Sequence, residues 1–184
     1  TKFFVEELFY NFKISGWSKD WFTGYPAYYF YFPLPPSIVA ILNLILPFNI
    51  SFKIMVLIAL VLLVISIEKL INLKIGTFSY IGFAGGLLYL LTESFTIFGG
   101  NLASSLAGQY SFTYSLAFAN LSIYYIRNNL IKLSVIKGSV LLGLSLLSHI
   151  IPFLIYAPIF LIYFLSSKSI NLEKLVGLLI FLFL

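Results

Sequence analysis

Residues Gly16 to Pro36, GWSKDWFTGYPAYYFYFPLPP, set the architecture expected of the whole chain. The three prolines at the end of this stretch remove backbone donors and argue against a helix there, and unpaired backbone groups are too costly in hydrocarbon. Its tryptophan and tyrosine rings are of the kind that settle among lipid headgroups, with Lys19 and Asp20 left to face water. We therefore predict an extramembrane loop that lies on the bilayer.

The composition of the chain around this loop is that of an integral membrane protein. Hydrophobic residues make up 61% of the 184 residues and charged residues only 9%, too little polar surface for a soluble domain. The net charge of +5 is scattered singly at the ends of apolar segments, which indicates membrane topology rather than nucleic-acid binding. No cysteine is present, so disulfides, thiolate nucleophiles and cysteine zinc sites are excluded. We expect one membrane domain, a fragment of a larger protein.

Apolar segments of different lengths predict which parts cross the membrane. Residues 1–51 are expected to form the external loop, with a short amphipathic helix over 1–13 and a partly inserted or interfacial helix over 37–46, about half the length of a span. Residues 52–184 are expected to hold the transmembrane helices. The predicted spans are 52–67, 75–91 and 108–126, then a hairpin with short arms over 138–165 and a further span from 175. The expected fold class is all-α, a polytopic transmembrane helix bundle with an external aromatic and proline-rich loop and interfacial helices.

Charged residues at the ends of these segments orient the bundle. Lys69 and Lys74 follow the first predicted span and residues 127–137 carry further cations, whereas the loop over 93–107 carries no positive charge. Since positive loops stay on the cytoplasmic side, the loop over 93–107 is predicted to be external. The loop Gly16 to Pro36 is then external too, provided that the segment over 37–46 does not cross.

The glycine-rich run FGGNLASSLAG, residues 98–108, has two readings. It lacks the Gly-Lys-Ser/Thr ending with which a phosphate-binding loop neutralises its ligand. Gly99, Ala103 and Ala107 are spaced four apart and are predicted instead to form a small-residue face for close helix packing.

Few polar residues could carry chemistry within so apolar a chain. His149, the only histidine, is either a satisfied polar core residue or the lining of an external cavity, since ionisable groups at membrane depth tend to mark functional paths. Asp20 and Glu93 are the acids predicted near the outer membrane surface, where each could be a general base, a cation ligand or merely a solvated carboxylate. Gln109 enters a span from outside and needs a polar partner.

Five stretches of the sequence resemble one family of membrane proteins. They are GWSKDWFTGYP (16–26), YFYFPLPP (29–36), SFK (51–53), FGGNLASSLAGQYSFTYSLA (98–117) and SLLSHIIP (145–152). In this order they resemble the archaeal and bacterial membrane proteins labelled 6-pyruvoyl-tetrahydropterin synthase-related, which are in turn similar to the GT-C superfamily of membrane glycosyltransferases. The pterin part of that label implies no pterin chemistry here, because the soluble enzyme needs a histidine zinc site and this chain has one histidine.

The resemblance implies that the chain is the amino-terminal half of such a protein without its first span, and that its site lies at the external membrane face. GT-C enzymes have a long external loop with interfacial helices and transfer sugar from a polyprenyl-phosphate donor. The residues then expected to bind substrate are Trp17, Trp21, Tyr25, Gln109 and His149. Gln109 stands where the family more often has glutamate, and the catalytic carboxylate is expected to be Asp20 or Glu93.

The leading prediction is a multi-pass cell-membrane protein, similar to glycosyltransferases, that handles a polyprenyl-phosphate-linked sugar. Its reaction would be displacement at the anomeric carbon with a carboxylate base, and the cofactor is left open, a divalent cation being one way to stabilise the leaving phosphate. One rival is a non-catalytic subunit with protein partners in a membrane complex, and another is a transporter or flippase for a lipid-linked substrate. Membrane lipid is an expected partner in every case, and nucleic acid in none.

Overall fold

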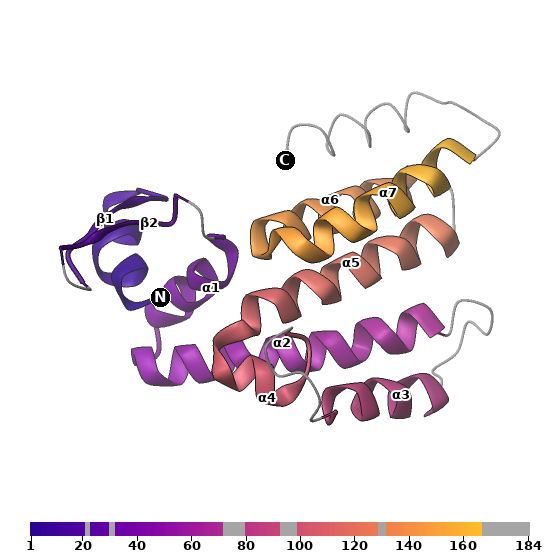
Figure 1. Cartoon of the computed structure of the whole chain (residues 1–184), viewed down its shortest axis with the longest axis horizontal. Helices are drawn as coiled ribbons and strands as arrows, with labels where there is room; N and C mark the ends of the chain where they lie inside the picture. The colour runs from indigo at the N-terminus through magenta and orange to yellow at the C-terminus, as the bar shows by residue number, and fades with distance from the viewer. Residues whose placement is uncertain (21–22, 30–31, 72–79, 93–98, 129–131, 167–184) are drawn as a thin grey trace. The chain divides into compact units, whose positions relative to one another are not determined.

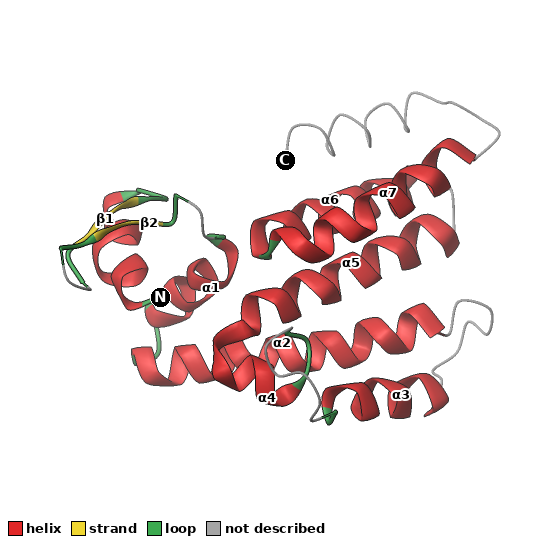
Figure 2. Cartoon of the chain, in the orientation of Figure 1, coloured by secondary structure: helices red, strands yellow, loops and turns green. Residues whose placement is uncertain are grey.

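A computed structural model describes residues 1–20, 23–29, 32–71, 80–92, 99–128 and 132–166 of the chain. It divides into two compact units, Thr1–Ile58 and Ala59–Leu184 (Figure 1). The described part is mainly helical, with a single small two-stranded sheet (Figure 2). The helical fold class is thus confirmed, and the sheet is an addition that the sequence analysis did not anticipate.

The first unit begins with the short amphipathic helix that was predicted. A helical segment over Phe4–Leu8 (η1) continues into a tight turn over Phe9–Asn11 (η2). Phe4, Val5 and Leu8 are buried, whereas the acids of the same turns face outward. The left-handed backbone of Phe12, with φ of 53°, ends the helix.

The sheet lies within the predicted loop over Gly16 to Pro36. Strands β1 (Gly16–Ser18) and β2 (Tyr25–Ala27) are antiparallel, with Trp17 opposite Pro26. Gly24 precedes β2 with φ of 90°, and a Cβ there would lie 2.6 Å from the Ser18 carbonyl oxygen. Only glycine fits that turn without strain.

Helix α1 (Leu34–Asn43) corresponds to the interfacial helix predicted over 37–46. The prediction that the prolines would exclude a helix was wrong in part, because Pro35 and Pro36 lie in its first turn, where a missing backbone donor breaks no bond. Ten residues give about 15 Å of helix, about half the thickness of a hydrocarbon core.

Helix α2 (Phe48–Ile71) contains the first predicted span and begins four residues earlier. It has 24 residues and a mean hydropathy of 2.8 in its most apolar window. In the part of the chain that the structure describes, α2 is the one helix both long and apolar enough to cross a membrane.

Helix α3 (Tyr80–Leu90) packs antiparallel to α2 through two glycines. A Cβ at Gly82 would lie 3.1 Å from the Glu68 Cα, and one at Gly86 would lie 3.1 Å from the Val64 carbonyl oxygen. Two glycines four residues apart let the two backbones touch. The first part of the predicted span over 75–91 lies outside the described residues.

The glycine-rich run does not form the predicted small-residue face. Gly99 lies in a turn with φ of 81°, and both Ala103 and Ala107 are exposed. The short helical segments that follow, α4 (Leu102–Ser104) and η4 (Ser105–Gln109), show that the expected loop over 93–107 is helical in its last part. Close packing by small residues instead occurs between α2 and α3.

Helices α5 (Tyr110–Asn128), α6 (Lys132–Ser148) and α7 (Ile150–Ser166) lie side by side. Their shared apolar core consists of Ile123, Ile126, Val135, Leu142, Ala157, Phe160 and Phe164. The α6 and α7 helices form the hairpin predicted around His149, with longer arms than expected because α6 begins at Lys132. Each arm has 17 residues, or about 25 Å.

Candidate functional site at the turn between α6 and α7

His149 is the single residue that separates α6 from α7. Its backbone N–H continues the α6 pattern by donating to the Ser145 carbonyl at 2.9 Å. Its ring Nδ1 accepts the Ile151 backbone N–H at 3.3 Å and so caps the first turn of α7. An Nδ1 that accepts carries no proton, which places the proton of the neutral ring on Nε2.

Two serine hydroxyls fix this turn onto α5. The Ser115 hydroxyl donates to the His149 carbonyl oxygen at 2.7 Å and lies 2.8 Å from the Ser145 hydroxyl. Because the Ser115 proton is used on the carbonyl, Ser145 is the donor of the pair. Both serines are fully buried, so the carbonyl at the end of α6 has a partner without water.

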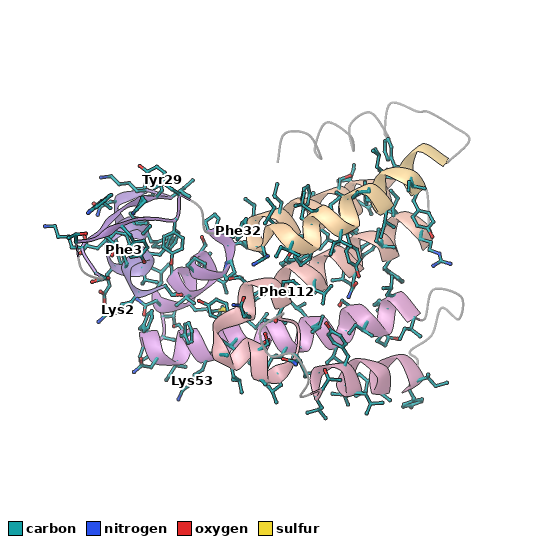
Figure 3. The ribbon with its side chains drawn as sticks, in the orientation of Figure 1. Lys2, Phe3, Tyr29, Phe32, Lys53 and Phe112 are labelled. Atoms are coloured by element: carbon teal, nitrogen blue, oxygen red, sulfur yellow. The ribbon has the colours of Figure 1, made fainter. Side chains whose placement is uncertain are left out.

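The imidazole also meets an aromatic ring from α5. Phe112 lies near the start of that helix (Figure 3), and its ring contacts His149 edge-on with centroids 5.5 Å apart. His149 lies outside both helices of the hairpin, and its partial burial lowers its pKa below the usual value of 6.5. The ring is therefore a neutral N–H donor at pH 7.

Gln109 lies on the same end of the bundle as His149, less than one turn before Phe112 on the chain. Its side chain is exposed, and its backbone carbonyl accepts the Thr113 hydroxyl at 3.4 Å. The structure thus places both predicted residues at one end of the second unit, but the residue that contacts the imidazole is Phe112.

Small polar side chains around α4, η4 and the start of α5 form two further groups, which the sequence analysis missed. The Ser105 and Thr113 hydroxyls lie 2.6 Å apart. Asn101 accepts the Ser104 backbone N–H at 2.8 Å and donates to the Thr92 carbonyl at 2.7 Å. Their signal in the sequence was the run of serine, threonine and asparagine at helical spacing within an apolar region.

A second buried network, equally unforeseen, joins three helices. The Tyr156 hydroxyl of α7 donates to the Asn120 Oδ1 of α5 at 2.6 Å. The Asn120 Nδ2 in turn donates to the Ser66 hydroxyl of α2 at 3.1 Å, which donates to the Leu63 carbonyl at 2.7 Å. Every group in this chain of bonds is satisfied, which is the condition for burying polar atoms cheaply.

The remaining predicted site residues in the described part belong to the first unit. The Asp20 carboxylate is exposed and accepts the Ser18 hydroxyl at 3.2 Å. Trp17 is 62% exposed and Tyr25 is 39% exposed, so both rings are available to a ligand or to lipid. Trp21 lies outside the described residues.

Metal ligation finds no support in the described part of the chain. No three of its histidine, aspartate or glutamate side chains come together as a metal site would require. Glu93, the second predicted carboxylate, lies outside the described residues.

The site is suited to holding a ligand by hydrogen bonds and ring contacts. It brings together the His149 imidazole, the exposed Gln109 amide and the ring of Phe112. Comparison of the chain with protein-family models, with curated proteins and with solved structures finds no match.

Proposed function

We propose that this chain is a multi-pass membrane protein that binds a polyprenyl-phosphate-linked sugar at its external face, as GT-C glycosyltransferases do. Embedding of the second unit in lipid, on which everything else depends, is supported by an inverted distribution of polarity. Its buried polar residues include Ser66, Thr113, Ser115, Asn120, Ser122, Ser139, Ser145 and Ser148. The exposed large apolar residues of its helix α7 are Ile150, Ile151, Leu154, Ile155, Ile159, Leu161, Ile162 and Tyr163. Water favours the opposite arrangement, whereas lipid favours this one.

Helix lengths support several crossings. Helix α5 has 19 residues and each arm of the α6–α7 hairpin has 17, or about 25 to 28 Å. That approaches the roughly 30 Å of a hydrocarbon core, and a small deficit is met by local thinning of the bilayer. The His149 turn then lies near one membrane surface, with the start of α5.

A lipid phosphate suits the donors at this turn. The neutral imidazole carries its proton on Nε2, and the exposed Gln109 amide offers two more donors. In the proposed reaction an acceptor hydroxyl attacks the anomeric carbon as the bond to the phosphate oxygen breaks. The hydroxyl proton passes to a carboxylate, Asp20 or Glu93, and the polyprenyl phosphate leaves.

Binding of undecaprenyl phosphate to the full chain in lipid nanodiscs tests this proposal. We expect His149→Asn to weaken binding at least tenfold while the folded protein remains, because asparagine still caps α7 but removes the imidazole donor. The matched control is Tyr80→Phe, at an exposed residue of α3. Equal binding by wild type and His149→Asn, or none by wild type, would contradict the proposal and favour a non-catalytic subunit.

A further inference from the structure

The end of the α5–α6–α7 bundle opposite His149 carries a second polar feature. Here α5 ends at Asn128 and α6 begins at Lys132. The two helices are in close contact just inside this end, since a Cβ at Gly138 would lie 3.1 Å from the Ser122 carbonyl oxygen and 3.7 Å from the Ile126 nitrogen. Cations from both helices therefore flank the same contact.

Each of two cations at this end is held over a tyrosine ring. The Arg127 guanidinium carbon of α5 lies 6.0 Å from the centroid of the Tyr163 ring on α7. The Lys137 ammonium of α6 lies 5.5 Å from the centroid of the Tyr125 ring on α5. Both cations are exposed, and neither forms an ion pair with any residue that the structure describes.

The described part of the second unit offers these cations no unengaged acid. Glu68 is the only acid within the described residues of the second unit, and it is 2% exposed with its carboxylate 3.6 Å from the Lys69 ammonium. The positive charge at Arg127 and Lys137 thus lacks a carboxylate partner in the described part. An anion from outside the chain can supply the missing charge.

The tyrosine rings give the two cations a binding geometry that charges serving only to set membrane topology would not need. A cation stacked on a ring face keeps its N–H groups free at the ring edge, and the guanidinium fork fits two phosphate oxygens at once. The Arg127–Tyr163 pair joins the last turns of α5 and α7, and the Lys137–Tyr125 pair joins the first turns of α6 to the last turn of α5. These turns lie at headgroup level if the helices span the membrane. A headgroup phosphate would meet a cation and a tyrosine hydroxyl together.

We infer that this end binds the phosphate headgroups of anionic bilayer phospholipids, one at the Arg127–Tyr163 pair and one at the Lys137–Tyr125 pair. The inference rests on the proposed membrane embedding of the second unit but not on its sugar substrate. It differs from the His149 site in its end of the bundle, in its cationic chemistry and in its ligand.

Native mass spectrometry of the full chain, released from nanodiscs of equal parts phosphatidylglycerol and phosphatidylcholine, tests the inference. We expect the wild type to retain phosphatidylglycerol preferentially. The double variant R127Q/K137Q should lose about 25-fold in affinity, from about fivefold for each cation removed near a membrane surface. The matched control K13Q/K19Q removes the same charge from exposed residues of the first unit and should retain the preference.

Three outcomes would overturn the inference. Equal loss in the two double variants would show a general charge effect, and no preference in wild type would show that the cations serve topology alone. Preferential retention of undecaprenyl phosphate over phosphatidylglycerol, lost in R127Q/K137Q, would assign this end to the lipid-linked substrate. Extraction of wild-type chain from membranes by alkaline carbonate would refute the proposed embedding itself, which is a different failure.

Discussion

The His149 ring caps α7 through Nδ1, which accepts the Ile151 backbone N–H and leaves the proton of the neutral ring on Nε2. Protonation would place a hydrogen on Nδ1 and abolish the cap. Since burial lowers the pKa of this ring below 6.5, the folded chain takes up its proton later than the unfolded chain as pH falls. The capped state is therefore fully stable above about pH 6.5 and loses stability below it.

The resulting prediction is a pH-dependent thermal stability of the full chain in detergent. The midpoint of unfolding should fall as pH is lowered from about 7.5 to about 5.5, with a loss of about 1 kcal/mol, the usual contribution of a cap. His149→Asn should unfold at nearly the same temperature throughout, since asparagine caps without titrating. His149 is the only histidine. An unchanged pH slope in the His149→Asn variant would therefore show that a group other than histidine causes the pH dependence.

Some contacts between helices could be predicted from the sequence and others could not. The hairpin could be predicted, because Ser148, His149 and Pro152 interrupt an apolar run too long for one helix. The contact at Gly82 and Gly86 was present as a glycine spacing but was overlooked in favour of the run at Gly99, where positive φ rather than packing requires glycine. Spacing alone does not distinguish these two reasons for a glycine.

Two neighbouring glycines of α3 allow a matched test of that contact. Gly86→Ala should lower the free energy of unfolding by about 1 to 3 kcal/mol, because its Cβ would meet the backbone of Val64 at 3.1 Å. Gly85→Ala meets only a side-chain carbon of Ile71 at 3.6 Å and should be neutral or stabilising by up to about 1 kcal/mol. Equal effects in a detergent unfolding assay would contradict backbone contact between α2 and α3.

The Asn120 network predicts an energetic coupling between α5 and α7. A double-mutant cycle of Asn120→Ala and Tyr156→Phe should give a coupling of about 0.6 kcal/mol and at most about 1.7, the range of hydrogen bonds between membrane helices. Tyr124→Phe, on α5 but outside this network, should show none with Asn120→Ala. A coupling as large for Tyr124 as for Tyr156 would indicate a general loosening of the bundle.

At the scale of the whole molecule, the sequence foretold the helical class and the apolar exterior but not the polar interior. Apolar composition and segment lengths are visible along the chain, whereas Ser66 and Asn120 become partners only once α2 and α5 are neighbours. The β-hairpin was missed for a related reason, since a loop rich in prolines and aromatic rings shows no alternating pattern. Tertiary packing decides which residues contact one another, and composition does not predict these contacts.

Membrane topology is the whole-molecule prediction that follows. In this cysteine-free chain, single cysteines at Lys19 and Ala107, both exposed, should react with an impermeant thiol reagent on intact cells. A cysteine at Lys137, also exposed, should react only after permeabilisation, because that end of α6 is predicted to be cytoplasmic. Labelling of one of the first two alone, or of Lys137 in intact cells, would disprove the predicted orientation.

Some of the buried serines bond only within their own helices, as Ser122 does to Ala119 and Ser148 to Leu144. The hydroxyls of these two serines need no partner on the neighbouring helix. What matters for packing at these positions is the small volume of the side chain. Evolutionary drift at these positions should accordingly follow size: alanine or glycine can replace serine over generations, whereas any larger residue separates the helices. At these positions serine is therefore selected for its small size rather than for its polarity.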